Sequence, residues 1–251
     1  LNTVAAQIID KLTPQASYEF LTEKLGFTSL VADDCNYAPL ALGELTHGVT
    51  VREMTQAYCA FLNEGTFTYG RTYSRVTDSK GNVILNNEPD TIQAFSKDTA
   101  ANMVDMLHYN VTNGIASAAS LKNMPSAGKT GSSTDWRNRY FAGFTPYYCA
   151  AVWTGYDQNQ TMSFSGNPAL DIWKSVMDGI DSALELPNKS FVSGTSTKST
   201  GIFGSHLDDV EPTPSPTPTP EATETPVHTT DPTPVETESP AAPEEPVEPA
   251  A

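Results

Sequence analysis

The chain has 251 residues and a formal net charge of −16, from 30 acidic and 14 basic side chains. The acidity is uneven, because residues 207–251 hold 11 Asp or Glu and no Lys or Arg. The first 206 residues are closer to balance, so the clustered Lys and Arg of a nucleic-acid footprint are absent there and no nucleic-acid partner is expected. No apolar run in the sequence is long enough to span a bilayer.

Hydrophobic periodicity and capping residues predict the elements of the first half. Residues 1–10 have the apolar spacing of the end of a helix, with Val4, Ala5, Ile8 and Ile9 as its apolar positions. Pro14 favours a helix over residues 15–25, which Gly26 ends, and residues 33–39 have the composition of a loop. Thr50 and Glu53 form a capping box, which predicts a helix from there to Asn63.

The second half predicts a small sheet among further helices. A hairpin over residues 73–85, with its turn at 78–82, precedes a helix over 97–109. Three strands follow, the first through Lys129–Ser132 and the others within 139–145 and 148–156. The last helix, over 168–186, is expected to turn these side chains inward: Ile172, Trp173, Val176, Met177 and Ile180. The pattern predicts an α+β fold, an antiparallel sheet flanked by helices.

The C-terminal segment differs in composition from the rest. Residues 207–251 contain 12 of the 19 prolines of the chain. They contain no aromatic residue that could support a core. Such a sequence cannot bury enough apolar surface to offset the entropy of ordering. We therefore expect one structured domain over residues 1–192, and a linker with a disordered, acidic Pro/Thr/Glu-rich tail over 193–251.

The cysteines and histidines indicate neither a metal site nor a cofactor. Cys35, Cys59 and Cys149 are scattered, and no Cys-x-x-Cys or paired His spacing occurs. Cys59 and Cys149 lie in apolar patterns typical of buried thiols. A catalytic triad based on histidine is not favoured, because no acidic residue lies at a sequence spacing from a histidine that would indicate a catalytic pair.

The sequence Ala127-Gly-Lys-Thr-Gly131 is the strongest chemical signal. A P-loop would need glycine at position 123, which is Asn123, and no helix pattern follows. A nucleophilic Ser126-x-x-Lys129 pair would need a helix, whereas Pro125 and Gly128 favour extended chain. The third interpretation is an anion-binding Lys-Thr-Gly strand of a serine acyltransferase, in which Lys129 and Gly131 face one way and Thr130 and Ser132 the other.

Four segments in this order resemble the transpeptidase domain of class A penicillin-binding proteins. They are residues 41–65, the Lys-Thr-Gly motif at 127–131, and two strands that contain Phe141-Ala-Gly-Phe-Thr-Pro146 and Val152-Trp-Thr-Gly-Tyr156, with Leu1-Asn2-Thr-Val-Ala matching the residues after a Ser-x-Asn serine. The resemblance covers about residues 1–191. It implies the penicillin-binding/β-lactamase-like transpeptidase fold, truncated at its N-terminus, because the Ser-x-x-Lys nucleophile and the Ser-x-Asn serine would lie upstream of Leu1.

The resemblance also implies roles for individual residues. Lys129 would attract the terminal carboxylate of a D-Ala-D-Ala stem peptide or of a β-lactam, and Thr130 and Ser132 would hydrogen-bond to it. Gly131 would let the ligand lie close to the strand, the Ser132 N–H would complete an oxyanion hole, and Asn2 would hold the substrate's amide. The implied reaction is D,D-transpeptidation through a serine acyl-enzyme, in a membrane-anchored parent that also carries a glycosyltransferase and acts in the cell wall outside the cytoplasm.

Two other classes remain open from the sequence. A D,D-carboxypeptidase or β-lactamase on the same fold would use water instead of an amine as the acceptor. A non-catalytic module for wall attachment is the second alternative. The 251-residue chain by itself is expected to be inactive, since the nucleophile is not part of it.

Overall fold

The computed structural model describes residues 2–194. Its helices are α1 (Asn2–Leu12), α2 (Pro14–Glu19), α3 (Tyr37–Leu42), α4 (Val51–Leu62), α5 (Lys97–Thr112) and α6 (Pro168–Leu184). Its strands are β1 (Thr66–Thr68), β2 (Arg75–Thr77), β3 (Val83–Asn86), β4 (Thr91–Gln93), β5 (Ala127–Ser132), β6 (Asn138–Phe144) and β7 (Cys149–Gly155). The predicted linker and tail lie almost wholly outside the described residues.

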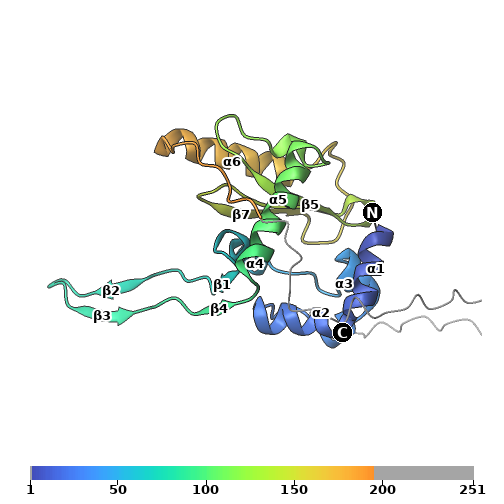
Figure 1. Ribbon diagram of the computed structural model, residues 1–251, viewed down its shortest axis with the longest axis horizontal. Helices are drawn as coiled ribbons and strands as arrows, with labels where there is room; N and C mark the ends of the chain where they lie inside the picture. The colour runs from blue at the N-terminus through green and yellow to red at the C-terminus, as the bar shows by residue number, and fades with distance from the viewer. Residues whose placement is uncertain (1, 195–251) are drawn as a thin grey trace, which may run out of the picture. The chain divides into compact units, whose positions relative to one another are not determined.

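The centre of the domain is a three-stranded antiparallel sheet in the order β5-β6-β7. Helix α6 packs on one face of β6 and β7, and α4 packs against the same two strands. Figure 1 shows α6 and α4 on opposite sides of the sheet, with α5 beside β5. The predicted α+β architecture, an antiparallel sheet flanked by helices, is confirmed.

Aromatic side chains of β6 join the sheet to both helix layers. Phe141 and Trp173 of α6 are fully buried and meet edge to face, with ring centroids 5.0 Å apart. The Trp173 indole N–H also donates to the carbonyls of Gly143 and Ala150, at 3.2 and 3.1 Å, so its polar atom is satisfied inside the core. On the other face Phe144, also fully buried, contacts Phe61, Tyr58 and Phe191.

The predicted capping box at the start of α4 is confirmed, and its Glu53 side chain also binds a second segment of the chain. One Glu53 carboxylate oxygen accepts from the backbone N–H and hydroxyl of Thr50, at 3.0 and 2.8 Å. The other accepts from the backbone N–H groups of Thr28 and Ser29, at 2.7 and 3.0 Å. This buried carboxylate therefore ties the segment after α2 to the first turn of α4.

Several helix ends differ from the predictions by two or three residues, and two regions differ in the kind of structure that forms. The predicted helix over 15–25 is an α-helix only to Glu19 and continues as a π-helical turn over Phe20–Lys24. Residues 37–39 were predicted to lie in a loop, but Tyr37 begins α3. The Asn36 side chain caps that helix, and Gly43 ends it with a φ of 80°, a conformation that glycine adopts without strain.

The buried face of α6 is narrower than its apolar residues suggest. Ile172 and Val176, predicted to point inward, are 47% and 48% exposed. The prediction is confirmed for Trp173 and Met177, which are buried together with Ala169 and Leu170. Only one stripe of the helix meets the sheet, and the apolar residues beside that stripe stay at the surface.

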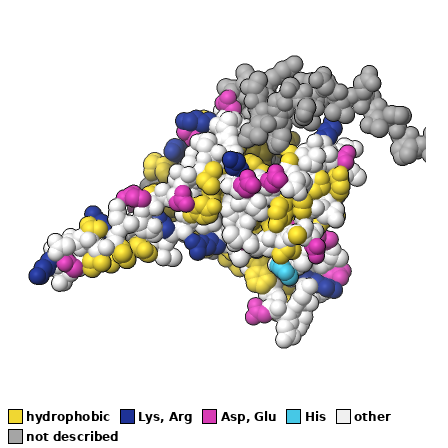
Figure 2. Space-filling view, turned by 90° about the horizontal axis from the view of Figure 1, so that it is seen from below, with side chains coloured by type: hydrophobic (Ala, Val, Ile, Leu, Met, Phe, Trp, Pro, Cys, Tyr) yellow, Lys and Arg dark blue, Asp and Glu magenta, His cyan; other side chains and the backbone are white. Residues whose placement is uncertain are grey.

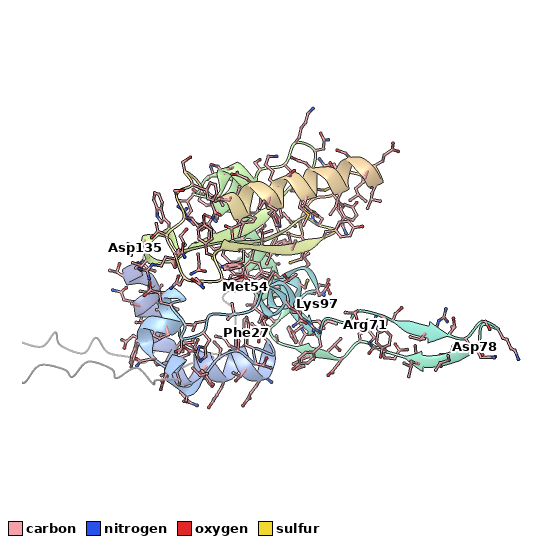
Figure 3. The ribbon with its side chains drawn as sticks, turned by 180° about the vertical axis from the view of Figure 1, so that it is seen from behind. Phe27, Met54, Arg71, Asp78, Lys97 and Asp135 are labelled. Carbon is pink, nitrogen blue, oxygen red and sulfur yellow. The ribbon has the colours of Figure 1, made fainter. Side chains whose placement is uncertain are left out.

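The predicted hairpin forms an arm that extends away from the sheet (Figure 1). At its tip the Asp78 carboxylate accepts from the backbone N–H groups of Lys80 and Asn82, both at 2.8 Å (Figure 3). Strands β1 and β4, which the sequence did not predict, pair at its base. Figure 2 shows hydrophobic side chains along the arm. Ile84 of β3 is 61% exposed. Within residues 2–194, no helix is long and apolar enough to cross a membrane.

Substitution of Glu53 tests the tie at the start of α4. Burial raises the pKa of Glu53, but hydrogen bonds from Thr50, Thr28 and Ser29 outweigh it and lower the pKa from 4.5 to about 2. The carboxylate therefore stabilises the fold fully above pH 4.5, and this contribution is lost as the pH falls toward 2. We expect Glu53→Gln to lower the free energy of unfolding near pH 7 by about 3 kcal/mol in urea denaturation.

The matched control is Glu64→Gln, which removes one partner of an exposed ion pair with Lys97. Exposed pairs of this kind contribute less than about 1 kcal/mol, so the control is expected to unfold close to the wild-type midpoint. Equal midpoints for Glu53→Gln and the wild type at neutral pH would show that the tie does not stabilise the fold.

Candidate active site

The Lys-Thr-Gly residues lie on β5, at one edge of the central sheet. Lys129 pairs with Ala142 of β6, and Thr130 pairs with Phe141. This confirms the extended conformation predicted for the motif and the alternation of its side chains, because paired residues share a face of the sheet. The motif is followed by a short turn and β6 instead of a helix, which agrees with the rejection of a P-loop.

The hydrogen bonds around β5 reveal which backbone groups face the open edge. In a strand, the N–H and C=O of one residue point to the same side, and this side alternates along the chain. The Gly128 carbonyl accepts from Asn110 of α5, so it points away from β6. The Ser133 N–H donates to the Asn138 carbonyl, toward β6. The backbone N–H and C=O groups of the even-numbered residues of β5 therefore point away from β6. The N–H groups of Thr130 and Ser132 thus point to the open edge.

Two side chains of α5 cover the first part of this edge. The Asn110 amide donates to the Gly128 carbonyl at 2.8 Å, and Nδ1 of His108 lies 2.7 Å from the Ser126 carbonyl. Sequence reasoning missed both residues, because it read the helix only for its apolar positions. The predicted helix also ended at residue 109, whereas α5 continues to Thr112 and therefore includes Asn110.

The Lys129 ammonium lies at the same edge. Its Nζ donates to the Thr130 carbonyl at 2.7 Å, and that carbonyl points outward by the alternation above. Partial burial of the ammonium lowers the pKa of Lys129 below its ordinary value. Among residues 2–194, no carboxylate lies within ion-pair distance of it. A cation without an acidic partner is available to an anion from outside.

The structure excludes Ser126 as a nucleophile paired with Lys129. Ser126 is 2% exposed, and its hydroxyl donates to the Ala119 carbonyl at 2.9 Å. It precedes a strand, where residues three apart do not share a face. The prediction that this Ser-x-x-Lys match is accidental agrees with the geometry.

Asn2 is not joined to β5 by any hydrogen bond between described residues. It is an exposed residue of α1, and α1 packs against α3. Glu44, just after α3, accepts a hydrogen bond from the Thr134 hydroxyl at 2.8 Å, immediately beyond the end of β5. The role of Asn2 stays a prediction.

This arrangement is suited to an extended ligand with a terminal carboxylate. Two backbone donors on a free strand edge can pair with a peptide laid alongside it, as in other β-strand additions. A lysine ammonium at the same edge adds a charge-assisted hydrogen bond for an anion. The hydroxyls of Thr130 and Ser132 lie on this strand as further donors.

The comparisons with known proteins agree with this fold. Residues 27–178 match the family model described as penicillin binding protein transpeptidase domain. The chain therefore belongs to the family of penicillin-binding protein transpeptidase domains. One relative is penicillin-binding protein 1A of Clostridium botulinum (strain Langeland), 37% identical over 179 residues, which are 70% of this chain and 22% of that protein.

Solved structures share the fold at low sequence identity. The D,D-transpeptidase domain of a peptidoglycan glycosyltransferase from Eggerthella lenta superposes with a TM-score of 0.59 and 20% identity, over 74% of this chain and 52% of that one. Penicillin-binding protein 1A from Haemophilus influenzae gives a TM-score of 0.61 and 19% identity, over 76% of this chain and 34% of that one. The chain spans about a fifth of the length of the curated relatives.

Two glycines of β5 provide a test of its packing. A Cβ at Gly128 would lie 2.6 Å from Cζ of the buried Phe141 and 2.7 Å from the Ala142 carbonyl oxygen. A Cβ at Gly131 would meet Tyr140 Cβ at 3.1 Å. We expect Gly128→Ala to reduce the free energy of unfolding by about 2–3 kcal/mol, and Gly131→Ala by less than about 1 kcal/mol.

Urea denaturation of both variants measures the difference directly. The two substitutions make the same chemical change on the same strand, so each is a control for the other. A larger loss for Gly131→Ala than for Gly128→Ala would contradict the placement of Gly128 against Phe141.

Proposed function

We propose that this chain supplies the carboxylate-binding strand of a D,D-transpeptidase that cross-links peptidoglycan. The observation that carries the proposal is the free edge of β5, where the Lys129 ammonium and the N–H groups of Thr130 and Ser132 converge. Membership of the transpeptidase family supports the reaction class. The donor would be a stem peptide that ends in D-Ala-D-Ala, and a β-lactam would occupy the same place.

Each residue of the motif has a physical role in this proposal. Lys129 attracts the donor's terminal carboxylate, and the hydroxyls of Thr130 and Ser132 donate hydrogen bonds to it. Gly131 leaves space for the donor to approach the strand. The Ser132 N–H stabilises the oxyanion that forms when a serine attacks the penultimate carbonyl, a contribution of roughly 3–4 kcal/mol per donor in comparable sites.

The serine itself would come from outside the 251 residues. The sequence contains one Ser-x-x-Lys match, at Ser126, and that hydroxyl is buried and already bonded to Ala119. Covalent catalysis needs a serine whose proton a neighbouring base can take, so an upstream part of the protein must bring both groups to this edge. Asn2 would enter the site from the side of this upstream part and bind the amide of the donor.

The remaining proposals concern the whole protein. Residues 1–192 would be part of its transpeptidase domain, and residues 193–251 a linker and tail. The resemblance to class A proteins favours a parent that also polymerises glycan strands, is anchored in the membrane and acts at the outer face of the cell membrane.

Labelling with a fluorescent penicillin tests where the nucleophile lies. We expect the 251-residue chain to form no covalent adduct, because its one Ser-Lys match is buried on extended chain. The product of the reading frame extended upstream of Leu1 should become labelled. A stable adduct on the 251-residue chain, located by peptide mapping, would overturn the assignment.

Substitution of Lys129 in that longer product tests carboxylate recognition. We expect Lys129→Ala to slow acylation by the fluorescent penicillin about 100-fold or more, because an electrostatic contact made in the transition state is lost. Lys129→Arg should retain part of the rate. Lys122→Ala, at an exposed lysine before β5, is the matched control and should react like the wild type. Equal acylation rates for Lys129→Ala and the control would remove Lys129 from the site.

A further inference from the structure

Two cysteines face each other between the α4 layer and the sheet. Cys59 lies in the last turn of α4, and Cys149 is the first residue of β7. The Cys149 thiol contacts the Thr55 carbonyl, with the sulfur 3.7 Å from the oxygen. Side chains of a helix point toward its N-terminus, so the Cys59 sulfur lies over the turn that contains Thr55. The two thiols are therefore neighbours, and each shifts the pKa of the other.

The surroundings hold this pair in place and leave it reachable. The Cys149 side chain packs against the buried cluster that contains Phe144, next to Tyr58 and Phe61 of α4. Both cysteines are half-buried, which differs from the buried thiols that the sequence predicted. A small oxidant can therefore reach them, while the packing of α4 on β7 prevents the thiols from separating.

The two thiols also differ in reactivity. The neighbouring Cys149 thiol lowers the pKa of Cys59, and the Cys59 thiol together with burial raises the pKa of Cys149. Cys59 is therefore the thiol that ionises first and acts as the nucleophile in exchange.

We propose that Cys59 and Cys149 form a disulfide that links α4 covalently to β7. The oxidant is a disulfide compound, such as oxidised glutathione. The Cys59 thiolate attacks one of its sulfurs, a mixed disulfide forms, and one thiol leaves. Cys149 then loses its proton and attacks the Cys59 sulfur, so the second thiol leaves. The protein loses two protons and two electrons, and the oxidant is reduced to two thiols.

This bond would join α4 to the sheet whose β5 strand carries the candidate site. Helix α4 carries Glu53, which holds the preceding segment, and β7 supports β6, to which the Lys129 strand is paired. A cross-link between residues about 90 positions apart restricts the unfolded chain strongly. Formation in the cell rests on the proposed function for one point alone, an oxidising compartment outside the cytoplasm.

Native and denatured oxidation of the 251-residue chain distinguish this bond from random pairing. In an unfolded chain, Cys35 and Cys59 are about 24 residues apart, so loop closure favours that pair over Cys59–Cys149 about sevenfold. In the native chain, oxidised glutathione followed by alkylation and peptide mapping should give Cys59–Cys149 as the main cross-link, with Cys35 alkylated. In guanidinium chloride, Cys35–Cys59 should dominate.

Thermal unfolding supplies a second measurement. Oxidation should raise Tm by roughly 5–15 °C in the wild type. Cys35→Ser is the matched control and should keep this rise, since Cys35 contacts Gln15 instead of either thiol. Cys59→Ser and Cys149→Ser should lose it. Where a serine variant does not fold, the mapping of the wild-type chain decides.

Three results would overturn the proposal. They are a native map dominated by pairs that contain Cys35, two thiols at 59 and 149 that remain open to alkylation or carry glutathione, and an oxidised chain less stable than the reduced one. None of these readouts uses penicillin or a stem peptide, so a failed disulfide and a failed transpeptidase assignment are told apart.

Discussion

The candidate site depends on how helix α5 meets strand β5. Asn110 and His108 bind the outward carbonyls of Gly128 and Ser126, so the first part of the strand's outer edge is satisfied by protein groups. Beyond Gly128 the helix no longer supplies partners, and the same alternation turns the Thr130 and Ser132 N–H groups to the open side. The outer edge of β5 is therefore bonded to α5 up to Gly128 and open from Thr130 onward. The open part defines where an extended ligand can bind.

The rest of the domain keeps this edge in position. Phe141 packs on Trp173 on one face of β6, and Phe144 packs on the α4 aromatics on the other. Because both faces of the middle strand are held, β5 cannot shift its register without moving a buried aromatic ring. The Glu53 carboxylate extends this support to the segment before α4, so the sheet, α4 and the N-terminal helices form one connected structure.

Much of this could be predicted from the sequence. The capping box, the hairpin turn and the three strands follow from short-range chemistry, and the strand conformation of the motif followed from Pro125 and Gly128. The exposure of Ile172 and Val176 could not be predicted, because periodicity identifies an apolar face but not how wide a stripe the sheet covers. Strands β1 and β4 have three residues each, and the whole hairpin arm separates them in the chain. No local sequence pattern therefore predicted them.

The site was predicted in part. Lys129, Thr130 and Ser132 share a strand as expected, but the residues that orient that strand are on a helix about 20 positions earlier in the chain. Asn110 lay just beyond the predicted end of that helix, and only the tertiary structure gives His108 and Asn110 their carbonyl partners. The role of Asn2 stays a prediction, because no hydrogen bond between described residues joins Asn2 to β5.

Amide hydrogen exchange of β5, followed by NMR in the folded chain without ligand, tests the central claim most directly. The account predicts slow exchange at Lys129 and Gly131, whose N–H groups bond to β6, and fast exchange at Thr130 and Ser132, whose N–H groups face the open edge. The reverse pattern would place the motif's donors inside the sheet and contradict the account.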